Sequence, residues 1–447
     1  MATQTAASVA RTDAEAVQAL GEARERTLEL VASVSDDDLE RVHSTLMSPL
    51  VWDLGHIAAF EDLWLVHRFG GHPMLREELG DVYDAFETPR AGRGQLPFLR
   101  PAEAREYLDQ VREKTIEVTV RRGVEDGSIH ELVLRHEQQH NETMLQTLQL
   151  AHLNGYELPI AAGARRHPAR EDVASRPGGD SVAGATGLDT IEIPAGSCTI
   201  GAPASGFAYD NERPRHRSDV RAYLIGRTPI TNASYLTFAE GGGYERREWW
   251  SSEGWAWKEE YDITRPAGWT ADHRAEWRLS RLVRLHPERP VVHVSWFEAD
   301  AFARAHEARL PTEIEWEKAA TWDQERQISR SYPWGEEPPE PGVHANVDQL
   351  GGGPLDAESH LAGASSYGCL GMIGDVWEWT GSDFAGYPGF VAHPYPEYSE
   401  VFFGTAHKVL RGGSWATRAR VATPTFRNWD FPERRQIFAG LRIARDV

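Results

Sequence analysis

The chain changes character near residue 190, so one uniform architecture is excluded. Before that point apolar residues such as Val17, Leu20, Leu28 and Val31 recur every three or four positions, the spacing of a helix that buries one face. Helices are predicted over residues 12–34, 50–69, 101–121 and 128–154. Four helices of this kind pack as a bundle, and we place this domain at residues 12–158.

The second half has the features of irregular structure. The chain contains 40 Gly, 26 Pro and 16 Trp, a mix typical of long loops with aromatic anchors. Strands are expected at residues 190–194, 291–295, 408–411 and 439–443, and helices at 296–308 and 313–322. These features predict an α+β, loop-rich domain over residues 190–447, joined to the bundle by a linker at residues 159–189.

The charge balance and the cysteine count exclude several functions. A formal net charge of -21 repels a phosphate backbone, so no nucleic-acid partner is expected. Cys198 and Cys369, the two cysteines, can build neither a disulfide framework nor a thiolate metal cage. No apolar run reaches the roughly 20 residues that span a membrane, and the N-terminus lacks the apolar stretch of a signal peptide. We expect a cytoplasmic protein.

The strongest chemical signal is a pair of histidines in the run LRHEQQHNETM. His136 and His140 are four positions apart, so both imidazoles lie on one face of a helix and can bind one metal ion. The run also has the HExxH spacing of zinc proteases, in which Glu137 would be the general base. The extended protease motif, however, requires Gly and His where this chain has Thr143 and Gln146. A zinc hydrolase is therefore the less favoured alternative.

A third ligand is available on an earlier predicted helix. His56 lies in the run WDLGHIAAFED, and bundles commonly build metal sites from facing helices. Three neutral histidines leave coordination positions open, which suits Fe(II) and oxygen better than a closed structural zinc site. We therefore predict that His56, His136 and His140 bind Fe(2+). Nearby carboxylates are candidates to orient these ligands: Asp53, Glu61 and Glu142.

Both halves of the sequence resemble known families. The pattern of His56 followed by His136, His140 and Glu142 resembles the DinB-like domain of ergothioneine-pathway sulfoxide synthases. The C-terminal half resembles the formylglycine-generating-enzyme (sulfatase-modifying factor) fold, a variant of the C-type lectin fold. The motifs that carry this second resemblance include ERPRH (212–216), RLPTEIEWEKAA (309–320), GDVWEWT (374–380), VLRGGSWAT (409–417), TFRNWD (425–430) and FAGLRIA (438–444).

The resemblance implies a particular reaction. In that family an iron enzyme uses O2 to join hercynine (Nα-trimethylhistidine) at imidazole C2 to a thiol, giving a thioether sulfoxide. The implied thiol is γ-glutamylcysteine, with free cysteine as the alternative. Formylglycine generators rely on a C-terminal cysteine pair, whereas residues 411–447 contain no cysteine. We therefore expect the C-terminal half to supply substrate contacts and not to make formylglycine.

The resemblance also implies which residues contact the substrates. For hercynine these are Gln139, Asn428 and Trp429. Arg90 and Arg93 are expected to receive the glutamyl part of γ-glutamylcysteine, because guanidinium groups clamp carboxylates, and Asp430 is expected to pair with an amino group.

A tyrosine is expected to supply a proton that steers the reaction toward coupling and away from thiol dioxygenation. Tyr387 is the predicted residue, with Tyr395 and Tyr398 of the same loop as alternatives. Phe402 and Phe403 are candidates to line the pocket. A third function class is also open, in which the lectin-like half is a non-catalytic binding module beside an idle bundle.

Overall fold

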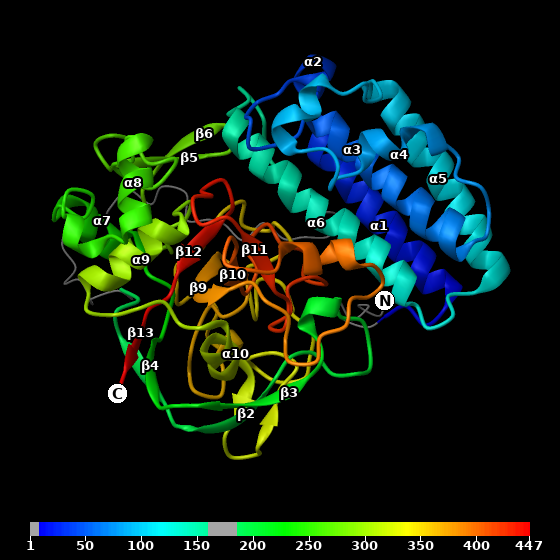
Figure 1. Ribbon diagram of the computed structural model, residues 1–447. Helices are drawn as coiled ribbons and strands as arrows, with labels where there is room; N and C mark the ends of the chain where they lie inside the picture. The colour runs from blue at the N-terminus through cyan, green and yellow to red at the C-terminus, as the bar shows by residue number, and fades with distance from the viewer. Residues whose placement is uncertain (1–8, 160–185) are drawn as a thin grey trace.

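The first half of the structure is a four-helix bundle. The computed structural model describes residues 9–159 and 186–447. The bundle consists of α1 (Asp13–Val31), α3 (Leu50–Glu61), α5 (Pro101–Arg122) and α6 (Ser128–Ala151) (Figure 1). The segments between them contain the short helices α2 (Asp36–Glu40) and α4 (Gly80–Tyr83). All four predicted helices are present, whereas most of the predicted linker lies outside the described residues.

Local sequence signals set the ends of these helices. Thr12 and Glu15 cap the start of α1 reciprocally. Pro101 opens α5, where its missing N–H leaves no bond unmade. The predicted run 50–69 is helical throughout, but it continues after α3 as a π-helix, η1 (Asp62–Phe69). The π-helix is a rare form, and where it occurs it is often at a functional site. Helix α6 ends before the predicted residue 154 because His152 is left-handed.

A buried cluster of four charged residues joins the four helices. Glu61 accepts hydrogen bonds of 2.8 Å from Arg24 and from Arg112. Glu137 accepts bonds of 2.8 and 3.0 Å from the same two arginines. Burial raises the pKa of Glu61, but Arg112 and Arg24 outweigh it and hold this pKa at about 2. The cluster therefore fixes α3 and α6 relative to each other.

Replacement of Glu61 by Gln is expected to destabilise the protein in a pH-dependent way. A carboxyl group whose pKa is 4.5 unfolded and about 2 folded contributes about 3 kcal/mol at neutral pH. This contribution is fully present above the unfolded pKa and is lost as the pH falls toward the folded one. Urea unfolding of both proteins from about pH 7 down to about pH 3 measures the difference, which should shrink as the solution becomes more acidic. A difference that is constant with pH would contradict the ion-pair account.

The second half is built on two small sheets. The first has the order β11-β10-β9-β12, formed by β9 (Trp377–Asp383), β10 (Lys408–Arg411), β11 (Asn428–Asp430) and β12 (Ala439–Leu441). Strand β10 is antiparallel to both neighbours, and β12 is parallel to β9. The second sheet has the order β1-β4-β13, formed by β1 (Thr190–Ile193), β4 (Tyr223–Gly226) and β13 (Ala444–Asp446). The predicted α+β, loop-rich class is confirmed.

The remaining elements are short. Two-stranded pairs are formed by β2 (Gly196–Ile200) with β3 (His216–Val220), β5 (Ala275–Arg278) with β6 (Arg281–Arg284), and β7 (Trp322–Asp323) with β8 (Ile328–Ser329). The helices are α7 (Asn232–Glu240), α8 (Ser252–Glu260), α9 (Trp296–Ala305) and α10 (Glu313–Thr321). Short 3-10 helices are η2 (Glu77–Leu79), η3 (Arg90–Gln95), η4 (Asp210–Glu212), η5 (Arg247–Trp249), η6 (Leu361–Gly363), η7 (Pro396–Tyr398) and η8 (Glu400–Phe402).

One predicted strand, residues 291–295, is wrong. The run is buried, but none of its residues forms a β-bridge with a described strand. The nearest β-bridge is formed by the preceding residue, Pro290, with Thr231. His293 has a φ of 63°, which an extended strand cannot accommodate. A short apolar run reports burial, and burial alone does not distinguish a strand from a buried loop.

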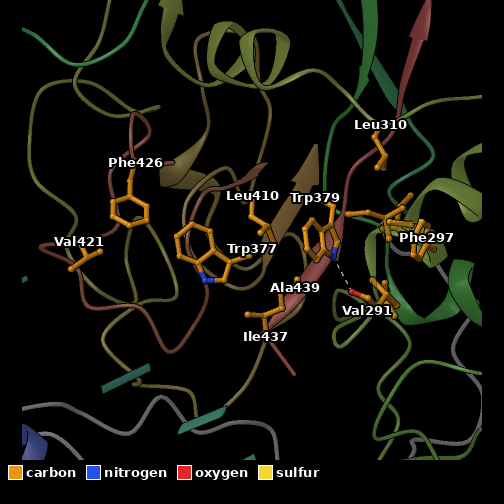
Figure 2. Close-up of a cluster of buried hydrophobic side chains, with 14 of the residues drawn as sticks. Val291, Phe297, Leu310, Trp377, Trp379, Leu410, Val421, Phe426, Ile437 and Ala439 are labelled. Atoms are coloured by element: carbon orange, nitrogen blue, oxygen red, sulfur yellow. Dashed lines mark hydrogen bonds between the residues drawn. The ribbon is translucent and has the colours of Figure 1, made fainter. Parts of the chain in front are cut away.

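Helix α6 lies between the two halves of the molecule (Figure 1). On one side Leu145 and Leu148 belong to the same hydrophobic cluster as Trp415 and Phe438 of the second half. Beyond this contact, Trp377 and Trp379 of β9 pack with Leu410 in the core of the second half (Figure 2). The two halves therefore share buried surface along α6. None of the helices in the described ranges has the length and apolar character needed to cross a membrane.

Candidate metal centre

Three histidines from two helices meet inside the bundle. His56 is on α3, and His136 and His140 are one turn apart on α6. One ring nitrogen from each residue lies within 4.8 Å of the other two. The ring centroids are 4.6 to 4.9 Å apart. The structure thus brings together all three residues that were predicted as ligands.

The outer nitrogens of two of these rings are held by hydrogen bonds. The Nδ1 of His56 lies 2.7 Å from the carbonyl oxygen of Tyr83. The Nδ1 of His140 lies 3.1 Å from Oδ1 of Asp53. A carbonyl or carboxylate at Nδ1 places the proton there, which leaves each Nε2 as a free electron-pair donor.

The donor set fits a metal ion. Burial lowers the pKa of His56 and of His136 well below the usual value, and the neighbouring histidines lower both further. Both rings are therefore neutral at physiological pH, which is the form that binds metals. The Nε2 atoms of His56 and His136 are 3.1 Å apart, close to the distance of about 3 Å between two nitrogens that bind one ion at a right angle and at about 2.1 Å.

Aromatic rings fix the orientation of two ligands. The Trp52 ring stacks on His56 with a centroid distance of 4.9 Å, and Phe60 stacks on His136 at 3.6 Å. The sequence analysis missed these residues. Their positions four residues before and after His56 carry the signal, because such positions share one helix face.

Of the three carboxylates predicted to orient the ligands, only Asp53 contacts a histidine among the described residues. The prediction is wrong for Glu61, which belongs to the buried arginine cluster. It is also wrong for Glu142, which accepts its hydrogen bonds from the C-terminal half. A carboxylate that is close to a ligand histidine in sequence therefore need not lie beside it in the structure.

Glu137 is placed where it cannot serve as a hydrolytic base. Its carboxylate accepts hydrogen bonds from Arg24, Arg112 and the hydroxyl of Thr27, the last at 2.7 Å. It is 1% exposed and lies in the charged cluster. A general base must reach the proton that it abstracts. The HExxH spacing in this chain therefore gives two ligands and a structural glutamate, and the zinc-hydrolase alternative lacks its base.

The structure favours Tyr395 and Tyr398 over Tyr387 as neighbours of the histidines. Tyr387 packs in a separate core with Cys198, Ile200 and Trp322, and its Oη lies 3.4 Å from a guanidinium nitrogen of Arg411. Its ring also packs against the ring of His216, with a centroid distance of 4.7 Å, so these contacts all belong to the C-terminal half.

Tyr395, in contrast, stacks on Trp64 of η1 with a centroid distance of 5.1 Å. Trp64 lies 6.0 Å from Phe60, the ring that stacks on His136. Tyr398 stacks on Tyr209 at 4.6 Å, and Gln139 of α6 donates a hydrogen bond to the Tyr209 hydroxyl. Tyr395 is therefore linked to α3 through Trp64, and Tyr398 is linked to α6 through Tyr209.

The residues predicted to bind hercynine come from both halves of the molecule. Gln139 is on α6, and Asn428 and Trp429 are on β11. The Trp429 ring stacks on Phe384 at 4.2 Å and lies 6.2 Å from Tyr398. Contacts through Tyr398 and Tyr209 thus connect β11 with Gln139. Phe402 also lies 5.5 Å from Trp429, whereas Phe403 packs against Phe384 and Phe390.

The two predicted arginines differ in their surroundings. Arg93 is buried, and it donates hydrogen bonds to Thr88 O, Ser48 Oγ and Ala85 O. Burial, assisted by the charge of Arg90, lowers the pKa of Arg93 to about 10. Arg90 is half-buried, and its charge also acts on Asp430, whose pKa is raised by burial and lowered by Arg90 and Arg434. Arg90, Arg93 and Asp430 therefore form one electrostatic neighbourhood.

Comparison with known proteins agrees with this two-part architecture. Residues 19–144 match the model of the DinB superfamily, and residues 180–447 match that of the sulfatase-modifying factor enzyme 1-like domain. A formylglycine-generating enzyme of Streptomyces coelicolor is 32% identical over 273 residues, which cover 54% of this chain and 84% of that protein.

Relatives named hercynine oxygenase match almost the whole chain. The hercynine oxygenase of Mycolicibacterium thermoresistibile is 43% identical over 446 residues, covering 97% of this chain and 95% of that protein. The hercynine oxygenase of Mycobacterium tuberculosis is 43% identical over 434 residues, covering 96% and 98%. Together with the three-histidine group, these matches identify a metal-dependent oxidoreductase. The chain belongs to the hercynine oxygenase family.

Proposed function

We propose that this protein catalyses the Fe(II)- and O2-dependent coupling of hercynine to γ-glutamylcysteine, giving γ-glutamyl-hercynylcysteine sulfoxide in ergothioneine biosynthesis. The observation that carries the proposal is the convergence of three histidines, with one ring nitrogen of each within 4.8 Å of the others, in a chain 43% identical to hercynine oxygenases. His56, His136 and His140 would hold the ferrous ion, which would supply the open positions at which the thiolate and O2 react. We further propose that the protein acts in the cytoplasm.

The proposed reaction balances without another reductant. Formation of the C–S bond removes a hydrogen from imidazole C2 and one from the thiol, which releases two electrons. Oxidation of the sulfur to the sulfoxide releases two more. Four electrons and these two protons reduce O2 so that one oxygen atom enters the sulfoxide and the other leaves as water.

We assign the proton donor to Tyr395. Its ring is stacked on Trp64 beside the ligand helices, and no hydrogen bond to its hydroxyl is among the influences on its pKa from the described residues. The hydroxyl of Tyr398, by comparison, is engaged with Tyr209. Burial raises the pKa of Tyr395, so the hydroxyl carries its proton at neutral pH and can donate it.

We assign Gln139, Asn428 and Trp429 to hercynine, and Arg90, Arg93 and Asp430 to γ-glutamylcysteine. The charge repulsion between Arg90 and Arg93 supports this assignment, because a bound carboxylate would offset it. Asp430, with its carboxylate near Arg90, is available to an amino group. Free cysteine lacks the glutamyl carboxylate, so it would use fewer of these groups.

The proposal is tested with purified protein, Fe(II), hercynine and O2, supplied in parallel with γ-glutamylcysteine or with cysteine. Mass spectrometry identifies the products. A coupled sulfoxide is expected, and it should form more efficiently from γ-glutamylcysteine. If neither thiol gives a C–S coupled product, the proposed function is rejected.

The variant Arg90→Ala is expected to weaken the use of γ-glutamylcysteine selectively. Loss of one charged contact to a carboxylate raises KM for this thiol by about 10-fold or more, with little change for cysteine. Arg90 is the informative position because Arg93 also holds three backbone and side-chain acceptors of its own loop. Steady-state kinetics with both thiols measures the effect. An equal loss for both would argue against the glutamyl contact.

A further inference from the structure

We propose that Glu142 is a positioning residue that locks the substrate-bearing sheet of the C-terminal half onto the ligand-bearing helix α6. The inference rests on the proposed function and extends it. Glu142 is 7% exposed and lies two residues after His140 on α6. It makes none of its hydrogen bonds to the histidines; all three come from the other half of the molecule.

Three donors converge on this one carboxylate. Trp377 Nε1 and Ser414 Oγ each donate to Oε1 at 2.7 Å, and Thr417 Oγ1 donates to Oε2 at 2.6 Å. The three donor residues are at most 3% exposed. Hydrogen bonds to a charged acceptor in a buried setting are short and strong, and they leave the groups little freedom to shift.

The three donors come from two neighbouring strands of one sheet, at the start of β9 and just after the end of β10. Trp377 is the first residue of β9, and its ring packs against Phe426 with a centroid distance of 5.7 Å (Figure 2). Ser414 and Thr417 lie in the turn that follows β10. Glu142 therefore holds the start of β9 and the end of β10 at the same point.

Strands β9 and β10 are connected by pairing to β11, which carries two of the proposed hercynine contacts. Leu410 of β10 pairs with Trp379 of β9 on one side and with Asn428 of β11 on the other. The adjacent pair joins Val409 and Trp429. Gln139, the contact on the helix, lies one turn before Glu142. The hydrogen bonds of Glu142 to β9 and to the turn after β10 thus fix how far the residues proposed to hold hercynine lie from the histidines of α6.

The Glu142 carboxylate accepts from all three donors at once. In Glu142→Gln the side chain keeps its size, but an NH2 group replaces one acceptor oxygen, so a hydroxyl that donated to that oxygen must turn to accept instead and its own O–H loses its acceptor. A displacement of about 1 Å at a reacting centre costs on the order of 100-fold in rate. The three histidines lie elsewhere on α3 and α6, so their affinity for a metal should change little.

A second contact between the halves provides a matched control. Gln149, two turns further along α6, donates to Trp277 O at 2.8 Å and accepts from Leu279 N at 2.6 Å. These partners belong to the β5–β6 hairpin and its turn, which carries none of the proposed substrate contacts. Gln149→Met removes both bonds at similar volume. Thr417→Val removes one donor to Glu142 from the opposite side.

The experiment compares four proteins: wild type, Glu142→Gln, Thr417→Val and Gln149→Met. Ferrous affinity of the metal-free protein, thermal unfolding and the product ratio are measured for each. The ratio compares coupled sulfoxide with the sulfinic acid that forms when both oxygen atoms of O2 enter the thiol sulfur and hercynine is not joined. For Glu142→Gln we expect ferrous affinity within about 3-fold of wild type and a loss of coupled product of about 100-fold relative to sulfinic acid and residual thiol.

Thr417→Val should show the same shift to a smaller extent, and Gln149→Met should show only a lower unfolding temperature. Equal product ratios in wild type and Glu142→Gln overturn the positioning role, as does a shift of the same size in Gln149→Met. If the wild type itself forms no coupled product, the proposed function fails first, and the stated consequence of the Glu142 contact falls with it.

Discussion

His56→Ala is expected to lose stoichiometric Fe(II) binding and with it essentially all coupling activity. His56 is the only one of the three predicted ligands that comes from α3, so its loss leaves two imidazoles on a single helix. Changes to groups that merely orient a ligand typically cost 10- to 100-fold in metal affinity or activity. Removal of the ligand itself should exceed about 100-fold. Anaerobic titration of metal-free protein with Fe(II), followed by product assay, measures both quantities.

His130→Ala is the matched control for this variant. His130 is also a buried histidine of the bundle, and its Nε2 lies 3.0 Å from the Thr119 hydroxyl. It is not part of the three-histidine group. The control should lower stability while it keeps one ferrous site per chain. A ferrous site that survives in His56→Ala would show that the three rings do not act together, and the idle-bundle alternative would then be favoured.

The helical half could be predicted well because its signals are local. The 3.6-residue spacing and the caps at Thr12 and Pro101 are present within each segment. The boundaries of α6 and the change to a π-helix after Glu61 depend on packing, which the spacing does not encode. In the second half, the buried run at residues 291–295 was predicted as a strand because apolar character is the same in a buried loop and in a buried strand.

The candidate site divides in the same way. The three histidines could be found because two share a helix face and the third lies on a helix of the same bundle. The partners of Glu61, Glu137 and Glu142 could not be found, because each carboxylate meets donors far away in sequence. On a helix, neighbouring positions point in different directions, so proximity to a ligand in sequence does not imply contact with it.

The choice among the three tyrosines shows where sequence reasoning stops. Tyr387, Tyr395 and Tyr398 lie in one irregular segment with no periodicity. The path of that segment decides which hydroxyl reaches the bundle. In the structure it buries Tyr387 beside Arg411 and lays Tyr395 on Trp64.

Tyr395→Phe is therefore expected to lose at least about 100-fold in the rate of coupled sulfoxide formation, the usual contribution of a positioned proton donor. Phenylalanine keeps the ring that stacks on Trp64, so stability and ferrous affinity should stay close to those of the wild type. The thiol should then be diverted to sulfinic acid, because that product needs no proton from the tyrosine. Mass analysis of both products under single-turnover conditions measures the change.

Tyr387→Phe provides the comparison for this variant, since it removes a hydroxyl from the same segment. Its Oη has one weak partner, at 3.4 Å from Arg411, and its ring contacts are retained on substitution. Coupling activity should therefore fall by less than about 3-fold, because this single contact is long and Tyr387 packs in a core separate from the histidines. Loss of coupling in Tyr387→Phe with normal activity in Tyr395→Phe would reverse the assignment. A loss in Tyr398→Phe alone would instead place the donor on the ring that stacks with Tyr209.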